Sequence, residues 1–503
     1  MAENKLKEAF ISNLNGTTIT EISVGLTVTP LCILCRGLVF VFYHQIHGEK
    51  CFSWKFHLIL DFFLLVLPHV LSCTVLSDYL ILVPLVIAGI CIVFFITVYR
   101  TRNNHTGTSL DSICKYFVKV KLENQTVPSV TTLRVFINLL TAISILAVDF
   151  PIFPRRYAKT ETYGTGVMDL GVGGFIFGNA LVSPEARLQN GEPRSKLSTL
   201  RKQLLSVWPL IVLGFGRLIS VKSIDYHEHV SEYGIHWNFF FTLAIVKTLA
   251  SLLLAFVPAQ KSWIAATIVV FCYQFLLEMV DLKNFILHGS DRKGTRVGFL
   301  NANREGLFSA VGYLAIYMAG VQVGLYILKK RTLIKEWMKL ICDLMLTCLL
   351  MFMVFYVVNL YLEPASRRLA NLTFCVWIVT QYLFWLCSII ICDLILAFAQ
   401  YVVIGSKVPS TWKLWKSSYF NKKHDSSLKD SKQENVFCLI DAVGRNQLLF
   451  FLLSNIMTGL VNMMFDTIHS SGAFSLTVLL LYMFTNCIII YFLHIKNVTV
   501  KCW

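Results

Sequence analysis

Residues 370–398 read ANLTFCVWIVTQYLFWLCSIIICDLILAF, and Asp393 is the only Asp, Glu, Lys or Arg among them. A helix of this length is what a chain needs to cross about 30 Å of hydrocarbon. In lipid every backbone N–H and C=O must be paired within the segment, which an α-helix achieves. The run therefore predicts a membrane-spanning helix.

Twelve more apolar runs share this character along the chain. Of its 503 residues, 56% are hydrophobic and 15% are charged, whereas about a quarter of the residues of a soluble domain are charged. The sequence thus predicts an all-α polytopic membrane protein with about 13 transmembrane helices. The predicted spans are 22–43, 57–76, 79–98, 131–149, 164–183, 204–221, 237–257, 262–281, 306–328, 337–361, 370–398, 447–465 and 472–494.

The connections between these spans alternate between two faces, and one face carries about twice as many Lys and Arg as the other. The positive-inside rule assigns the richer face, which includes 99–130 and 184–203, to the cytosol. The N-terminus then lies on the opposite face. The predicted parts are a short non-cytosolic N-terminus 1–21, a single transmembrane domain 22–494 with a long cytosolic loop 403–446, and a short cytosolic tail 495–503.

The net charge of +16 comes largely from Lys and Arg that lie between the apolar runs. We therefore expect contact with anionic membrane lipids and no binding of nucleic acid. Most of the 15 Cys lie inside apolar runs, where Cys behaves as a small hydrophobic residue. We expect neither a disulfide framework nor a metal site.

Three connections on the non-cytosolic face, 148–164, 223–237 and 283–306, hold much of the polar chemistry. The positive-inside rule predicts few basic residues there, yet the first and third connections hold most of the basic residues of that face. An anionic ligand is the simplest explanation, because Arg suits bidentate phosphate binding. The candidates for substrate contacts are Arg155, Arg156, Arg292, Lys293 and Arg304, with Asn303 beside the last.

Asp149 ends an apolar run, and Pro151 and Pro154 prevent one continuous helix from there to Lys159. A carboxylate at a lipid-sheltered edge is readily protonated unless it is paired, which favours a general base. The alternative is a helix-end carboxylate that pairs with a neighbouring arginine for folding. Both interpretations stay open.

Two further groups carry open alternatives. Asp169 lies in a glycine-rich run that indicates close helix packing, so it either contributes to the site or pairs with another helix. His227 and His229 flank Glu228 at a spacing that matches no strong zinc pattern. They form a solvated rim, or they bind substrate and assist acid–base chemistry.

Other charges lie inside the predicted spans, where each is costly unless it is paired or faces a cavity. Interhelical pairing is the expectation for any one of them. Together they leave a polar pathway open, and this supports a lipid or solute transporter or flippase as the alternative function. The residues are Arg36, Asp61, Lys247, Glu278, Asp343 and Asp393. His69, alone on an apolar helix, is expected to be structural.

Several long motifs resemble one family. They are FISNLNGTT (10–18), ILAVDF (145–150), FPRRYAK (153–159), MDLGVG (168–173), YHEHVSEYG (226–234) and NANREG (301–306). In this order they are similar to the glucosaminyl-phosphatidylinositol inositol acyltransferases of GPI-anchor biosynthesis (PIG-W). The resemblance covers essentially the whole chain.

The resemblance implies an endoplasmic-reticulum enzyme that moves a fatty acyl group, typically palmitoyl, from acyl-CoA to the inositol 2-hydroxyl of glucosaminyl-phosphatidylinositol. Acyl-CoA is then a co-substrate, and no other cofactor is expected. The resemblance also implies that Asp149 and Lys159 are catalytic. We expect Asp149 to act as the base, with His227 or His229 assisting, and Lys159 to stabilise negative charge near the thioester.

Overall fold

The computed structural model describes residues 14–48, 53–106, 110–123, 127–187, 196–224, 230–292, 294–403, 406, 408–414 and 438–500. Within them, twelve helical segments are long and apolar enough to cross a membrane, which confirms the all-α polytopic fold. They are α2 (Ile19–His47), α3 to α4 (Trp54–Ser72), α5 (Leu82–Thr106), α7 (Pro128–Ala147), α10 to α11 (Lys196–Leu205 and Trp208–Ile224), α13 (Phe239–Phe256), α14 (Ser262–Met279), α17 (Arg304–Ile327), α18 (Ile334–Tyr361), α19 (Leu372–Val402), α21 (Gln447–Met464) and α22 (Gly472–Ile495).

Shorter elements join these segments. The helices are α6 (Leu110–Phe117), α8 (Leu170–Leu181), α9 (Pro184–Arg187), α12 (Val230–Tyr233), α15 (Leu282–His288), α16 (Phe299–Ala302) and α20 (Leu439–Arg445). Single turns lie at Ser77–Tyr79, Arg155–Tyr157 and Ala259–Lys261. The strands β1 (Leu122–Glu123) and β2 (Lys413–Leu414) pair antiparallel.

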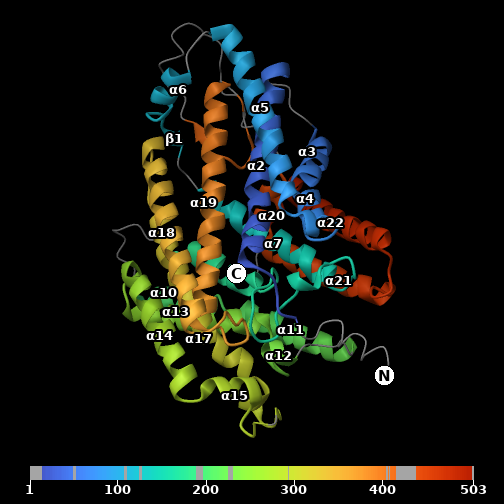
Figure 1. Ribbon diagram of the computed structural model, residues 1–503, viewed down its shortest axis with the longest axis vertical. Helices are drawn as coiled ribbons and strands as arrows, with labels where there is room; N and C mark the ends of the chain where they lie inside the picture. The colour runs from blue at the N-terminus through green and yellow to red at the C-terminus, as the bar shows by residue number, and fades with distance from the viewer. Residues whose placement is uncertain are drawn as a thin grey trace.

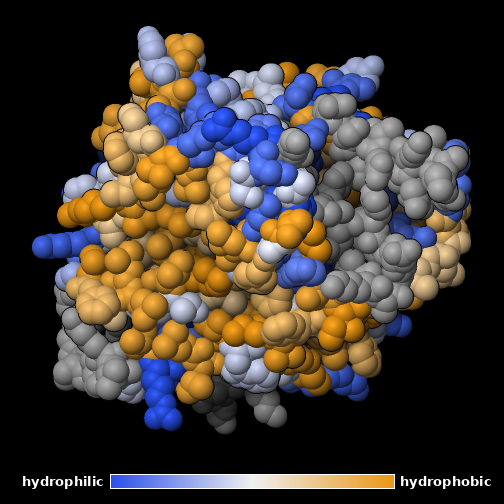
Figure 2. Space-filling model, turned by 90° about the horizontal axis from the view of Figure 1, so that it is seen from below, coloured by the Kyte–Doolittle hydropathy of each residue, from blue (hydrophilic) through white to orange (hydrophobic). Residues whose placement is uncertain are grey.

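Helix α19 forms the centre of one half of the molecule, with α2 and α18 packed along it and α5 packed on α2 (Figure 1). Helix α17 has the corresponding place in the other half, against α8, α13 and α14. The outward faces are apolar, as Phe256 and Tyr361 show with exposed fractions of 83% and 80%. Apolar residues also cover much of the face seen in Figure 2. Such a surface suits lipid rather than water.

The fifth predicted span, 164–183, is helical only from Leu170. Residues 164–169 instead pack on the segment before α2, where Thr17 N donates to Thr165 O at 2.6 Å. Gly164 has φ +125°, and a Cβ there would meet the carbonyl of Asn15. Because α8 has 12 residues, its length is about 18 Å, too short to cross the hydrocarbon alone.

The connections gather at two ends of the molecule, as the predicted alternation requires. We call the "loop end" the group formed by residues 14–18, 77–79, 148–169, 230–236, 281–303 and 362–371, which contact one another. The "strand end" contains β1, β2 and the Leu122 N to Thr332 O hydrogen bond of 2.8 Å. Which membrane face each end meets stays a prediction.

Part of the predicted loop 403–446 is folded. Cys438 is fully buried, and α20 packs on α7 and α22. Leu439 N donates to Asp61 Oδ2 at 2.8 Å, so a buried carboxylate fixes the start of α20. Residues 415–437 lie outside the described part of the chain.

Candidate functional site

The connection from α7 to α8 bends immediately after Asp149. The guanidinium of Arg155 fixes this bend, because its Nη2 donates to the carbonyls of Val148 at 2.9 Å and Phe150 at 3.1 Å. Asp149 Oδ2 accepts a hydrogen bond of 2.7 Å from Asn462 Nδ2 in the last turn of α21. Asp149 is therefore held between the end of α7 and the end of α21.

Arg155 lies near Asp149 and interacts with it electrostatically. This proximity fits the alternative in which Asp149 pairs with a neighbouring arginine for folding. Burial lowers the pKa of Arg155 to about 10, and the nearby Asp149 opposes that shift. The same side chain directs its described hydrogen bonds to backbone carbonyls. Arg155 thus shapes the bend, and its use in phosphate binding stays a prediction.

Arg156 points to a different set of partners. Its Nε donates to Glu21 Oε1 at 3.0 Å and its Nη2 donates to Asp78 Oδ1 at 2.8 Å. Tyr157 Oη donates to the same Glu21 oxygen at 2.7 Å. Two carboxylates therefore hold Arg156, and they bind the connection to the start of α2 and to the turn at 77–79.

Lys159 begins a row of alternating charges. Its Nζ donates to both oxygens of Glu232 in α12, at 2.8 and 2.7 Å. On the other side of Glu232, the Arg367 Nη1 lies 3.4 Å away, and the Arg367 Nε lies 2.9 Å from Asp169 Oδ1. Asp169 also accepts from Thr160 N at 3.2 Å and from Gly166 N at 2.9 Å.

The row has an exposed end and a buried end. The Lys159 side chain is 40% exposed, that of Glu232 15%, that of Arg367 5% and that of Asp169 0%. Burial opposes ionisation of Glu232, but Lys159 and Arg367 outweigh it and lower the pKa of this carboxyl to about 2. At Asp169 burial prevails over Arg367 and raises the pKa. Glu232 is therefore the carboxylate of the row that stays ionised at neutral pH.

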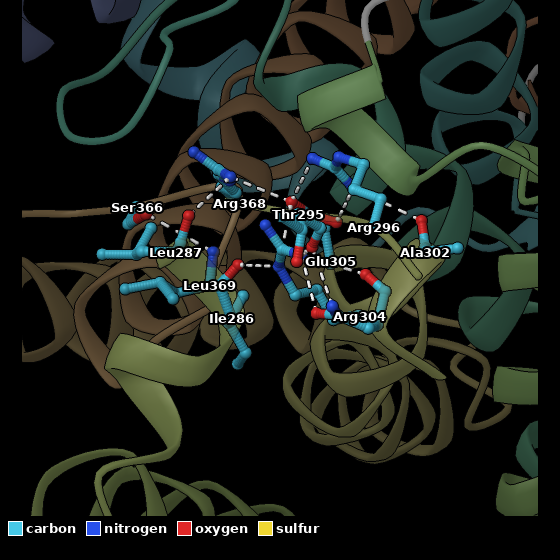
Figure 3. A network of polar contacts seen from close by, with 11 residues as sticks. Ile286, Leu287, Thr295, Arg296, Ala302, Arg304, Glu305, Ser366, Arg368 and Leu369 are labelled. Atoms are coloured by element: carbon cyan, nitrogen blue, oxygen red, sulfur yellow. Dashed lines mark hydrogen bonds and ion pairs between the residues drawn. The ribbon is translucent and has the colours of Figure 1, made fainter. Parts of the chain in front are cut away.

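A second charged cluster lies around Glu305, whose side chain is fully buried (Figure 3). Arg296 binds both of its oxygens, at 2.8 and 3.0 Å, and Arg368 Nη2 binds one at 2.9 Å. Arg304 points to the same cluster, but its donors reach mainly carbonyls, of Ile286 at 2.9 Å and Asn301 at 3.0 Å. This cluster links the connection between α14 and α17 to the connection between α18 and α19.

The remaining predicted site residues have diverse positions. Asn303 Oδ1 accepts from His236 N at 2.8 Å, so this buried amide joins two connections. Arg292 is 78% exposed and pairs with Asp281 at 3.1 Å. His227, His229 and Lys293 lie outside the described residues. Among the residues that are described, no three His, Cys, Asp or Glu side chains are placed to hold a metal ion.

The sequence reasoning missed the connection 362–371. Arg367 joins the Lys159 row, Arg368 joins the Glu305 cluster, and Glu363 pairs with Lys283. The signal was present, because this connection follows the tenth predicted span and belongs to the face expected to be poor in basic residues. Two adjacent arginines there required the same explanation as those of the other connections.

A cavity of about 330 Å³ lies between α7, α8, α11, α13, α17 and α21. Its walls include the apolar side chains of Phe175, Phe240 and Phe451. They also include two cations, Arg134 and Lys247. Arg134 lies 3.5 Å from Asn179 Oδ1, and among the described residues no carboxylate forms an ion pair with it.

The interhelical pairing expected for single charges inside spans is found for Arg36, Asp61, Asp343 and Asp393. It is not found for Glu278, whose described partner lies on its own helix α14, and Lys247 lines the cavity. Arg36 binds Asp61 at 2.6 Å, Glu278 accepts from Gln274 at 2.8 Å, and Lys247 Nζ reaches Ser206 O at 3.5 Å. Asp343 and Asp393 accept from hydroxyl groups of Tyr326 and Ser129. His69 is bonded to Thr29 at 2.8 Å and Leu65 O at 2.7 Å, in keeping with a structural role. These contacts favour packing over a polar transport pathway.

A family model described as GWT1 matches residues 3–493 of this chain. The chain belongs to the GWT1 family. It is 49% identical over 505 residues to "Glucosaminyl-phosphatidylinositol-acyltransferase PIGW" of Bos taurus, and 47% identical over 507 residues to the Homo sapiens protein of that name, with 100% of each chain covered. A more distant member, "GPI-anchored wall transfer protein 1" of Yarrowia lipolytica, is 34% identical over 502 residues, which covers 96% of this chain and 95% of the relative. The residues that match the GWT1 family model thus span all the connections of the loop end.

Proposed function

We propose that this protein is an O-acyltransferase that moves a palmitoyl group from acyl-CoA to the inositol 2-hydroxyl of glucosaminyl-phosphatidylinositol in GPI-anchor biosynthesis. The observation that carries this proposal is the similarity, over the full length, to mammalian proteins named for that activity. The ion pair between Arg36 and Asp61 weakens the argument for a transporter.

The chemistry requires a base for the hydroxyl proton and a cation for the developing oxyanion. In our proposal the Asp149 carboxylate takes the proton as the inositol oxygen attacks the thioester carbonyl. Lys159 stabilises the oxyanion. The C–S bond then breaks, and the CoA thiolate takes the proton back from Asp149. His227 and His229 stay candidates for assisting this proton transfer.

The cavity supports acyl-CoA as the donor. Arg134 lies in the first turns of α7, and Asp149 follows the last turn of the same helix. Fifteen residues separate them, which corresponds to about 22 Å along α7. In acyl-CoA the phosphopantetheine arm lies between the phosphates and the thioester, and the acyl chain extends beyond the thioester. We propose that Arg134 and Lys247 contact the CoA phosphates and that the arm extends from the cavity toward the reacting groups at the loop end.

The phosphate of the acceptor lipid requires a cation near the loop end. Arg292 and Lys293 remain our candidates, since Arg292 is largely exposed and its partner Asp281 is 54% exposed. Arg156, Asp169, Asn303 and Arg304 then act by shaping the connections around the acceptor. Membrane lipids surround the apolar outer faces.

We also propose an endoplasmic-reticulum membrane with the loop end in the lumen and the strand end in the cytosol. Asn15 is exposed at the loop end and begins the sequon Asn15-Gly16-Thr17. If the orientation is right, a glycosidase that removes N-linked glycans shifts the protein's mobility, and Asn15→Gln abolishes the shift. A glycan on a sequon engineered into the loop 415–437 would overturn the orientation.

The decisive experiment is acyl transfer by the purified protein in detergent, with labelled palmitoyl-CoA and glucosaminyl-phosphatidylinositol. Wild type, Asp149→Asn, Lys159→Ala and the control Lys261→Ala are compared after their folding is verified. Product from wild type and the control, with little from the other two, supports the function and its site. Product from all four keeps the function and discards the site. If wild type binds the lipid without making product, the proposed activity is wrong.

A further inference from the structure

Arg367 is the most firmly held cation of the row formed by Lys159, Glu232, Arg367 and Asp169. Its connection is held from several sides, because Gly164 N donates to Ala365 O at 2.9 Å and Ser366 N donates to Asn371 Oδ1 at 3.1 Å. The next residue, Arg368, is bound to Glu305 at 2.9 Å. A side chain that is only 5% exposed on such a connection has little freedom to move. Lys159, at the other end of the row, is 40% exposed.

The position of Glu232 between two cations has a chemical consequence. If Lys159 alone paired with Glu232, a turn of Lys159 toward an oxyanion would leave a buried carboxylate without a counter-charge, which is strongly unfavourable. With Arg367 Nη1 3.4 Å from Glu232 Oε1, the carboxylate keeps a partner when Lys159 leaves. The attraction that holds Lys159 in place is also reduced, because the positive charge of Arg367 opposes that of Lys159.

We propose that Arg367 is a positioning residue for acyl transfer: it holds Glu232 from the buried side and so leaves Lys159 free to reach the reacting carbonyl. This inference rests on the proposed role of Lys159 in the transfer. Arg367 does not touch substrate in this scheme. It acts through Glu232.

The row has further charged neighbours that set its electrostatics. Arg217 of α11 interacts with Glu232, and Tyr313 of α17 interacts with Arg367. Among the described residues, the further titratable and charged groups that interact with the row are Arg217, Tyr233 and Tyr313. Changes at Glu232 and Arg367 alter the charge next to Lys159 without touching Lys159 itself.

The test measures, without substrate, how firmly Glu232 holds Lys159. The purified full-length protein is treated with an amine-acylating reagent over a range of pH, and modification of Lys159 is followed by mass spectrometry with exposed Lys261 as the internal standard. In Glu232→Gln the carboxylate that holds Lys159 is lost, so the amine is released and labels about tenfold faster. In Arg367→Gln it labels more slowly. Arg367→Lys restores the charge and lies between Arg367→Gln and wild type.

Acyl transfer is measured on the same samples. We expect Arg367→Gln to lower kcat with little change in KM for either substrate, and Arg367→Lys to recover part of the lost kcat. Equal labelling of Lys159 in wild type and all three folded variants would overturn the proposal. If Arg367→Gln does not fold, equal labelling in Arg367→Lys and Glu232→Gln overturns it as well. Opposite labelling shifts without transfer by wild type would instead retain the row and reject the proposed function.

Discussion

Two ion pairs in this protein link elements far apart in the sequence, and they differ in their surroundings. Arg36 and Asp61 join α2 to α3 with exposed fractions of 1% and 0%. Lys159 and Glu232 join two connections of the loop end with exposed fractions of 40% and 15%. The first pair is enclosed by Pro409 O and by the start of α20. The second is open on the lysine side.

This difference separates a charge used for folding from a charge available for chemistry. Arg36 has no route away from Asp61, because helices and α20 surround both groups. Lys159 faces solvent on one side, and Arg367 supports its partner Glu232 from the other. In our proposal, the exposed Lys159 and the independent support of Glu232 are what distinguish this pair from the buried one.

Asp61→Asn is expected to have the largest effect. It leaves the Arg36 charge buried without a counter-charge, which costs about 3–5 kcal/mol of stability. The measurement is the free energy or midpoint of unfolding in detergent. The double variant Arg36→Leu/Asp61→Leu should recover much of the loss, because it removes both buried charges. An unchanged midpoint in Asp61→Asn would show that the pair is not a folding element.

Lys159→Ala should show the opposite pattern. Because the lysine is exposed and Glu232 keeps Arg367, the cost in stability is about 1 kcal/mol or less. Acyl transfer should fall by about 100-fold, as expected when oxyanion stabilisation is lost. Unfolding and transfer are measured on one preparation. If Lys159→Ala lost much stability but kept its activity per folded molecule, the Lys159–Glu232 pair would serve folding, as the Arg36–Asp61 pair does.

Arg134→Gln tests a cation that lacks a described carboxylate partner. We expect KM for acyl-CoA to rise by about tenfold, the effect of removing one charge-assisted hydrogen bond, while kcat changes little. The rise should shrink at high salt, because ionic screening already weakens the contact in wild type. Lys335→Gln, at the exposed start of α18, is the matched control. A change in kcat with an unchanged KM would show that Arg134 does not bind the acyl donor.

An effect confined to acid pH is expected at Glu232. Since the pKa of Glu232 is lowered to about 2, its contribution to stability is complete above the unfolded value of about 4.3 and is lost as pH falls toward 2. Wild type should therefore keep its unfolding midpoint between pH 7 and 5 as far as Glu232 is concerned. Below pH 4 it should lose more stability than Glu232→Gln does. Parallel curves of stability against pH for wild type and Glu232→Gln would contradict this expectation.

Most of the helical fold could be predicted from the sequence, because a membrane-spanning helix is encoded in one uninterrupted run of residues. The runs 337–361 and 472–494 differ from α18 and α22 by three residues or fewer at either end. The start of α8 was wrong by six residues. Thr165 there binds Thr17 and Gly164 binds Ala365 instead of continuing the helix, and these contacts join distant parts of the chain.

The candidate site was predictable only in part. The motif around Asp149 and Lys159 is local, so sequence was sufficient to single it out. The partners of these residues, Asn462 and Glu232, come from α21 and α12. Arg367 comes from a connection 208 positions beyond Lys159. Pairings across such separations depend on how the helices pack, which no single stretch of sequence encodes.

The shortness of α8 affects how far a substrate must travel. A helix of about 18 Å in a hydrocarbon layer of about 30 Å leaves about 12 Å of membrane depth to irregular backbone. The connection 164–169 occupies that depth without exposing peptide groups to lipid, because Thr17, Ala365 and Asp169 bind its polar atoms. Hydrogen bonds to other parts of the chain there replace the helical hydrogen bonds that a full span would supply.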